Sequence, residues 1–361
     1  MKWLGKFPDP FIREIAGQPD ALRRAAAGLA GQRTALLEIA DAATGRSIAF
    51  TGMGSSYDAC YPIVTGLARA GVMAVMVDAS ELLHFRRAML DATTLVVAVS
   101  QSGESAEVVR LAHAMAEGTD RPIVVAVTNG RTNTLAPIAD VVLDTRAGPE
   151  TGPSTMTFAA SLVCLAALGG ALTGEDPGRV IERVSEEADR TARAIEDLLQ
   201  DEELPGRLAD LLGERRSAVI LGRGPARAAA EMGALTLKEA AGIAIESLQT
   251  AQFRHGPLEL AGPGLAAVVI ATEPETFELD LGLAGELVAA GSAVLVVTAG
   301  DHGTGRSVPG GALRVDIGDL AGLVAPAASI VPAQLLAWCL AARRGRRPGR
   351  YERASKVTTV E

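Results

Sequence analysis

The chain has few cysteines and no long apolar run, and each scarcity excludes a class of protein. Its three cysteines, Cys60, Cys164 and Cys339, are far apart among 361 residues. They form neither a disulfide framework nor a metal-binding spacing, so we interpret them as reduced core thiols. The longest apolar run, near residues 161–173, is too short to cross a bilayer, and the N-terminal MKWLGKFPDPF lacks the apolar segment of a signal peptide. We therefore expect a cytoplasmic protein without a membrane partner.

Basic charge is also scarce, which limits the partners of the chain. Lysine and arginine number 34 against 43 acidic residues, for a formal net charge of −9 at pH 7. This balance argues against nucleic acid as a partner, and it means that local donors must hold any anionic ligand. Hydrophobic residues make up 48% of the chain, enough for a large core, and the length suits two domains of ordinary size.

The most informative stretch runs from Thr94 to Ser105. Residues 94–99, TLVVAV, form a short apolar run typical of a buried strand in a parallel sheet. The loop Ser100-Gln101-Ser102-Gly103 follows, and a helix with acidic residues in its first turn is expected from Glu104. Free backbone N–H groups and the hydroxyls of Ser100, Ser102 and Ser105 could together bind a phosphate. The alternative is an ordinary strand-to-helix turn in which the serines act only as caps.

Strands and helices alternate on both sides of this stretch. Apolar runs near 47–51, 72–77, 94–99, 122–127 and 141–143 predict strands, with helical patterns between most of them. The second half repeats the plan, since residues 217–227 echo the strand and G-x-G turn of 47–56. We predict an α/β fold of two similar domains, each with a parallel sheet covered on both faces. The expected bounds are a helical lead over 1–46, a first domain with a helical connector over 47–200, a second domain over 201–345, and a tail over 346–361.

Neither G-x-G turn fits a dinucleotide-binding fingerprint. Gly52-Met53-Gly54 and Gly222-Arg223-Gly224 both lack the third glycine, and no acidic residue follows at the expected distance. We interpret Gly54-Ser55-Ser56 instead as a second polar loop. It should lie beside Ser100–Ser105 at the carboxyl edge of the sheet, where open α/β sheets bind ligands.

Three further residues are candidates for chemistry, each with a plain alternative. Glu239 ends an apolar helical run, where it could be a buried general base or a solvated side chain next to Lys238. His255 is framed by Gly256 and Pro257, but taken alone it is more simply a structural loop histidine. Lys356 near the C-terminus would form a Schiff base only if it had a pocket, since tail lysines are normally solvated.

Taken in order, these segments resemble the sugar-isomerase (SIS) family. More narrowly, they resemble the isomerase half of the glutamine–fructose-6-phosphate aminotransferases, over nearly the whole chain. The resemblance is carried by Gly54-Ser-Ser-Tyr57, by Ser100-Gln-Ser-Gly-Glu-Ser105, by GALTLKE at 233–239, by HGPL at 255–258 and by ASKVTTVE at 354–361.

The resemblance implies two SIS domains, each a three-layer α/β/α sandwich, in a homodimer with composite active sites. It implies that a sugar 6-phosphate is held by the set Ser55, Ser56, Ser100, Gln101, Ser102 and Ser105. Glu239 would move the proton between C1 and C2, and His255 would assist ring opening from the neighbouring subunit. Lys356, in a tail that closes the active site, would meet the carbonyl of the open-chain sugar. No metal or organic cofactor is indicated.

The chain also departs from the family's pattern. We expect no glutaminase domain, because Lys2 stands where such a domain would carry its cysteine nucleophile. The family usually has a lysine at the position of Thr236 and another at Met156. The resemblance therefore suggests a phosphosugar isomerase or deaminase that acts on an amino-hexose 6-phosphate. Open alternatives are a transaminase that uses ammonia from a separate source, a fructosamine-phosphate deglycase, and a non-catalytic phosphosugar sensor.

Overall fold

The computed structural model describes residues 9–117, 119–213 and 215–360. Lys2, part of the glutaminase prediction, lies outside this range. The chain divides into two compact units, each built around one sheet. The β1–β5 unit comprises residues 20–150, 154–189 and 353–361, and the β6–β10 unit comprises residues up to 19, 151–153 and 190–352.

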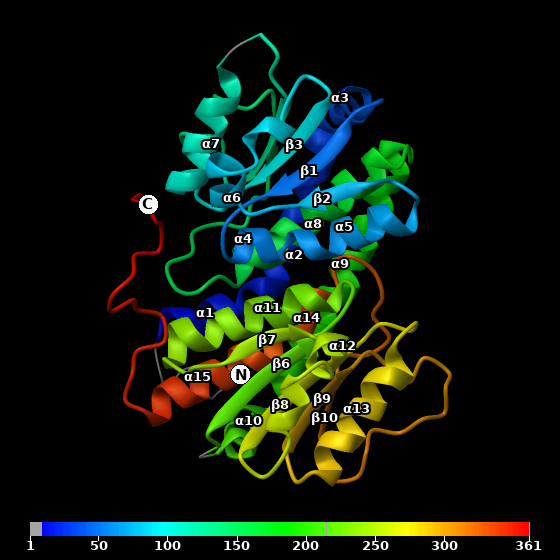
Figure 1. Ribbon diagram of the computed structural model, residues 1–361, viewed down its shortest axis with the longest axis vertical. Helices are drawn as coiled ribbons and strands as arrows, with labels where there is room; N and C mark the ends of the chain where they lie inside the picture. The colour runs from blue at the N-terminus through cyan, green and yellow to red at the C-terminus, as the bar shows by residue number, and fades with distance from the viewer. Residues whose placement is uncertain (1–8, 118, 214, 361) are drawn as a thin grey trace. The chain divides into compact units, whose positions relative to one another are not determined.

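The β1–β5 unit is a parallel five-stranded sheet between two helical layers (Figure 1). Its strands are β1(Ser47–Thr51), β2(Ala74–Met76), β3(Thr94–Val99), β4(Ile123–Thr128) and β5(Val141–Asp144). Its helices are α2(Gln18–Leu29), α3(Arg33–Ala43), α4(Ser55–Asp58), α5(Cys60–Arg69), α6(Ala79–His84), α7(Ala106–Ala116), α8(Met156–Leu172) and the first part of α9(Pro177–Gln200), with short 3₁₀ turns at Ala30–Gln32 and Arg87–Met89. Successive strand residues face opposite layers, α6 and α7 on one side and α3, α5 and α8 on the other.

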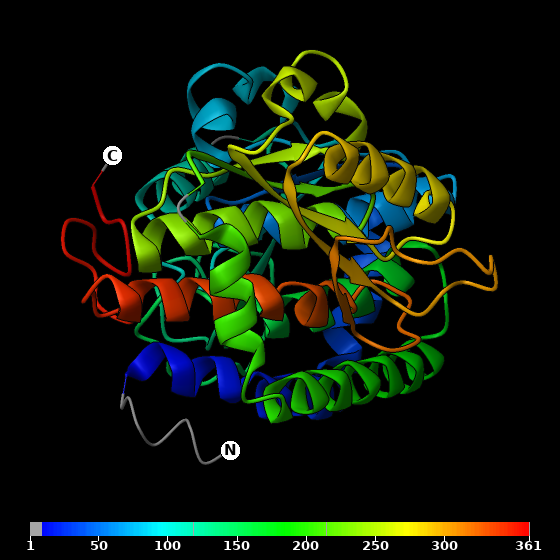
Figure 2. The same cartoon turned by 90° about the horizontal axis from the view of Figure 1, so that it is seen from below.

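The β6–β10 unit repeats this architecture. Its parallel strands are β6(Ser217–Gly222), β7(Glu246–Gln249), β8(Leu265–Ala271), β9(Ala293–Thr298) and β10(Leu313–Asp316). Its helices are α1(Pro10–Ala16), α10(Leu204–Leu212), α11(Ala226–Thr236), α12(Thr250–Phe253), α13(Phe277–Ala289), α14(Pro326–Ser329) and α15(Val331–Arg343), with a π-helical turn η4(Leu237–Ala241) and a 3₁₀ turn η5(Pro257–Leu260). One face of the sheet packs on α12 and α13, and α10 and α11 lie on the other with α15 alongside them (Figure 2).

The predicted α/β class and the two parallel sheets are confirmed. One expected helix start was wrong, and one strand was missed. The helix after β3 begins at Ala106, with Ser105 as its N-cap, so Glu104 precedes it and Glu107 is the acidic residue of its first turn. The strand β7 was not predicted. Within the described residues, no helix is both long enough and apolar enough to span a membrane.

Candidate functional site

The strand order of the β1–β5 unit creates a switch point between β1 and β3. The order is β2-β1-β3-β4-β5, so the chain leaves β1 toward one edge of the sheet and continues from β3 toward the other. Such a point, at the carboxyl ends of the strands, is where open α/β sheets bind ligands. The loops that follow β1 and β3 meet here, because the Gln101 backbone N–H donates to Ser56 Oγ at 3.3 Å. The prediction that these two loops lie side by side is confirmed.

Serine hydroxyls organise the loop after β3. Ser100 Oγ accepts a hydrogen bond from Gly103 N at 3.1 Å, and Ser102 Oγ accepts one from Glu104 N at 3.1 Å. The Oγ atoms of Ser100 and Ser105 are 3.3 Å apart. Free backbone N–H groups are expected here from the sequence, but those of Gly103 and Glu104 are already used within the loop. Because an oxygen that accepts still has its own O–H to donate, the serine hydroxyls remain available as donors to an anion.

A neighbouring loop after β4 braces the serine loop. Asn129 N donates to the carbonyl oxygen of Gln101 at 3.1 Å. The Glu104 carboxylate accepts hydrogen bonds from both the hydroxyl and the backbone N–H of Thr134, each at 2.7 Å. These bonds hold the pKa of Glu104 below its ordinary value, the hydroxyl contributing most. The loop is thus fixed in shape before any ligand arrives.

The C-terminal tail brings Lys356 to this side of the unit. Lys356 Nζ donates to Glu150 Oε2 at 2.7 Å and lies 3.5 Å from Ser154 Oγ. Ser154 Oγ also accepts a hydrogen bond from Ser55 Oγ at 2.9 Å. The lysine is therefore connected to the loop after β1 through a single hydroxyl. Sequence reasoning missed Glu150, and it assigned no role to Ser154, which lies two residues before Met156.

A second contact fixes the tail to the same unit. The backbone N–H of Ala106, the first residue of α7, donates to the carbonyl oxygen of Thr358 at 3.0 Å. An N–H in the first turn of a helix has no partner within the helix, so an outside acceptor stabilises it. The tail thus lies at the end of α7 that follows the serine loop.

Glu239 lies in the β6–β10 unit, on a π-helical turn and not on the α-helix expected. The helix α11 ends at Thr236, and η4 continues to Ala241. The Glu239 side chain is half-buried, whereas Lys238 is exposed to solvent. Thr236, at the position of a family lysine, is fully buried, and its Oγ1 has no hydrogen-bond partner in the described part of the chain.

His255 is exposed, in the turn between α12 and η5 of the same unit. Its backbone N–H donates to the carbonyl oxygen of Gln252 at 3.0 Å, and Gly256 follows with a φ of +119°. The predicted residues therefore divide between the units. The serines, Gln101 and Lys356 belong to the β1–β5 unit, and Glu239 and His255 to the other.

The β6–β10 unit has an equivalent switch point, between β6 and β8, with different chemistry. Its strand order is the same, yet the loop after β6 carries Arg223, which lies 2.8 Å from Asp280. Thr276 Oγ1 also donates to Asp280 at 2.9 Å. Burial raises the pKa of Asp280 to about 6, although the Arg223 charge opposes the rise. An internal ion pair occupies the place where the other sheet presents serines.

A model of the SIS domain family matches residues 43–170 and 211–342. The chain belongs to the SIS domain family. Glutamine–fructose-6-phosphate aminotransferase [isomerizing] of Pyrobaculum aerophilum is 33% identical over 370 residues, an alignment that covers 100% of this chain and 59% of the relative. The chain thus spans less than two thirds of the length of this curated relative.

Solved structures share the fold of the two SIS domains. The C-terminal domain of glucosamine-fructose-6-phosphate aminotransferase from Francisella tularensis superposes with a TM-score of 0.85 at 22% identity, over 95% of this chain and 99% of that one. Glucosamine-6-phosphate deaminase from Thermotoga maritima gives a TM-score of 0.73 at 20% identity, over 96% and 99%. At these identities the likeness establishes the fold alone.

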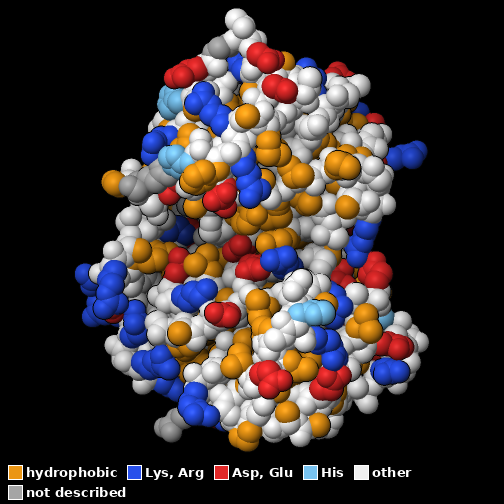
Figure 3. Space-filling view, viewed as in Figure 1, with side chains coloured by type: hydrophobic (Ala, Val, Ile, Leu, Met, Phe, Trp, Pro, Cys, Tyr) orange, Lys and Arg blue, Asp and Glu red, His pale blue; other side chains and the backbone are white. Residues whose placement is uncertain are grey.

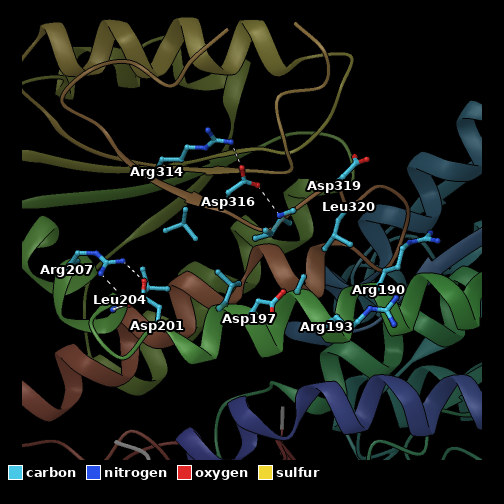
Figure 4. A pocket seen from close by; sticks show the side chains of 15 residues that line it. Arg190, Arg193, Asp197, Asp201, Leu204, Arg207, Arg314, Asp316, Asp319 and Leu320 are labelled. Atoms are coloured by element: carbon cyan, nitrogen blue, oxygen red, sulfur yellow. Dashed lines mark hydrogen bonds and ion pairs between the residues drawn. The ribbon is translucent and has the colours of Figure 1, made fainter. Parts of the chain in front are cut away.

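A pocket of about 500 Å³ lies in the β6–β10 unit (Figure 4). It is lined by charged side chains from α9, the start of α10 and the end of β10. Much of that charge is neutralised locally, since Arg207 pairs with Asp201 at 2.6 Å and Arg314 pairs with Asp316. None of the residues predicted from sequence lines this pocket.

A further pocket, of about 650 Å³, lies beside the end of α15 and includes Trp338, Arg346, Arg347 and Arg350. Figure 3 shows basic side chains gathered along the segment that follows α15, despite the net charge of −9. Arg346 lies 3.6 Å from Glu352, so part of this charge is also paired.

Proposed function

We propose that this protein is a phosphosugar isomerase and deaminase that acts on an amino-hexose 6-phosphate. In this reaction glucosamine 6-phosphate opens, isomerises toward the fructose form and, with one water, yields fructose 6-phosphate and ammonia, or the reverse. The observation that carries the proposal is the meeting of two hydroxyl-bearing loops and a tail lysine at one switch point. Such an arrangement can fix a phosphate by its oxygens and leave the far end of the sugar near an amine.

The proposed roles of the residues are those that the family resemblance implies. The six loop residues Ser55, Ser56, Ser100, Gln101, Ser102 and Ser105 would hold the phosphoryl group and adjacent hydroxyls. Lys356 would face the open-chain carbonyl, and Glu239 would transfer the proton between C1 and C2. We further propose a homodimer in which His255 of the neighbouring subunit assists ring opening. A monomer in analytical ultracentrifugation at assay concentration would contradict that arrangement.

Relatives support the substrate class but leave the fate of the nitrogen open. The curated relative is named an isomerizing aminotransferase, and one structural relative is named a glucosamine-6-phosphate deaminase. This chain lacks the family's lysines at Thr236 and Met156, and both of these side chains are buried. The loss of two cations suggests a changed substrate or reaction, which the assay of ammonia release tests.

The test is to measure ammonia and fructose 6-phosphate formed from glucosamine 6-phosphate by the wild type and Glu239→Gln. We expect Glu239→Gln to lose turnover by at least about a hundredfold, the usual worth of a general base. Binding of the sugar phosphate by Glu239→Gln should persist, because the residues proposed to hold the phosphate are unchanged. A thermal shift measures this binding, since a ligand at 100 times its Kd stabilises the folded state by about 2.7 kcal/mol. Glu259→Gln, an exposed glutamate in η5, is the matched control.

Other outcomes identify the alternatives. Formation of glucosamine 6-phosphate only from fructose 6-phosphate and ammonium would identify a transaminase. Cleavage of a fructosamine phosphate would identify a deglycase. A thermal shift with sugar phosphates but no turnover of any of them would overturn the enzyme and leave the sensor.

A further inference from the structure

The carboxylate of Glu150 is the most heavily hydrogen-bonded group near the switch point of the first SIS domain. It lies in the segment between β5 and α8, and its side chain has 0% exposure. Oε1 accepts hydrogen bonds from Thr155 N at 2.8 Å, Thr155 Oγ1 at 2.9 Å and Thr157 N at 3.2 Å. Oε2 accepts from Thr157 Oγ1 at 2.5 Å and from Lys356 Nζ at 2.7 Å.

The threonine donors and the lysine donor differ in kind. Thr155 and Thr157 belong to the turn that starts α8, five and seven residues from Glu150, so they stay in place when the tail moves. Lys356 is 206 residues away and reaches the carboxylate only because the tail is seated. A buried carboxylate that keeps its threonine donors remains hydrogen-bonded without the lysine, so the ion pair can open without leaving an unsatisfied acid.

The pair also fixes where the lysine amine lies. From Glu150 the amine reaches Ser154, which is hydrogen-bonded to Ser55 beside the loop after β1. A solvated tail lysine would lose rotamer freedom to adopt this position, and a charge-assisted hydrogen bond to a buried carboxylate offsets that cost. The second anchor, Ala106 N to the carbonyl of Thr358, stabilises the tail but not the amine.

We propose that Glu150 is a positioning residue that seats the C-terminal tail and aims Lys356 at the substrate. The role of Glu150 in seating the tail does not depend on the proposed function, whereas its effect on turnover rests on that function. In the resting pair Lys356 is an ammonium that donates hydrogen bonds. It acts on the sugar as a positioned charge unless its proton first passes to another group.

The experiment compares Glu150→Gln with wild type in limited trypsin digestion, with intact mass used to follow loss of peptides that end at 361. We expect the tail to be cleaved after Arg353 about tenfold faster, since losing a charged hydrogen bond shifts the opening equilibrium by about that factor. In turnover, kcat should fall about tenfold or more, while KM for the sugar phosphate changes less than about threefold. Asp140→Asn removes a carboxylate that pairs with Arg121 in the same unit, and it should leave both readouts unchanged.

A second variant keeps the proposal testable if Glu150→Gln does not fold. Lys356→Met removes the same contact from the tail side and leaves Glu150 its threonine donors, so we expect it to fold and to show the same faster cleavage. Wild-type cleavage rates in folded Lys356→Met or Glu150→Gln would overturn the seating role. Faster cleavage of Glu150→Gln with unchanged kcat, in a protein with measurable turnover, would overturn the aiming role. If the wild type turns over no sugar phosphate, the proposed function fails while the digestion result still stands.

Discussion

Asp280 shows how a single buried carboxyl group sets a pH dependence of stability. Its side chain is 1% exposed, and burial raises its pKa from 3.8 to about 6, against the opposing effects of Arg223 and Thr276. Below pH 3.8 the group is protonated in both the folded and the unfolded chain. Between those two pH values the folded state binds more protons than the unfolded state. The stability that Asp280 contributes therefore falls as pH rises, until it is lost above about pH 6.

Replacing this residue should remove that dependence. The free energy of unfolding of wild type minus that of Asp280→Asn should fall by about 2 kcal/mol between pH 4 and pH 7, since a pKa shift is worth about 1.36 kcal/mol per unit and part of the loss occurs below pH 4. Chemical denaturation at four pH values across this range measures the difference. Glu278→Gln, which makes the same carboxyl-to-amide change at an exposed residue in the first turn of the same helix, is the control. A flat difference for Asp280→Asn would mean that Asp280 titrates normally.

At the scale of the element, the serine loop depends on one glycine. Gly103 has a φ of +65°, and a Cβ built there would lie 2.2 Å from Asn133 Cγ and Oδ1. Asn133 cannot move freely, because its amide donates to Thr128 Oγ1 and its Oδ1 accepts from Ala136 N. A side chain at position 103 would therefore disturb both the loop after β3 and the loop that braces it.

Gly103→Ala should cost about 2 to 4 kcal/mol of stability, from the left-handed backbone and the clash together. Gly45→Ala is the matched control, since Gly45 has a φ of +72° but a Cβ there would meet no atom within 4 Å beyond its chain neighbours. It should cost only the backbone share, about 1 to 2 kcal/mol. Denaturant unfolding measures both losses of stability. Equal losses in the two variants would show that the Asn133 side chain moves aside at little energetic cost.

Elements were predictable where burial left a pattern in the sequence. The strand β3 runs from Thr94 to Val99 as expected, because its six residues are all buried and polar residues bound them. The edge strand β7, Glu246–Gln249, was missed because its side chains are half-buried or exposed and its sequence, ESLQ, is mostly polar. The π-helical turn that carries Glu239 has no apolar period of its own, so it was indistinguishable from a continuing α-helix.

The candidate site was predictable where its residues directly follow strands of the sheet, whose carboxyl ends share one edge. Ser100, Ser102 and Ser105 lie in one loop directly after a strand, so their common place at the sheet edge followed from the strand itself. Glu150 gave no such signal, because it lies in a loop and its role depends on contact with Lys356, 206 residues away. Position in a sequence does not reveal which distant segment will supply a partner.

At the scale of the whole molecule, one architecture occurs twice with different side chains at its two switch points. Both sheets have the same strand order, and both continue from their first strand into a G-x-G turn. In the first domain that turn continues as Ser55-Ser56, whereas in the second it continues as Pro225-Ala226, without hydroxyls. The loop after β8 adds Glu273, which packs against Gly224. Carboxylates at this second switch point repel an anion. Arg223 could attract one, but its guanidinium is already paired with Asp280.

We therefore predict one phosphosugar site per chain, in the first domain. Isothermal titration with glucosamine 6-phosphate should give a stoichiometry near one. Ser102→Ala should weaken binding by about tenfold, the worth of one hydrogen bond to a charged group. Arg223→Met, checked for folding by its Tm, should leave both stoichiometry and affinity within about twofold, because its guanidinium serves Asp280 and not the ligand. A stoichiometry near two that falls to one in Arg223→Met would show that the second SIS domain binds phosphosugar as well.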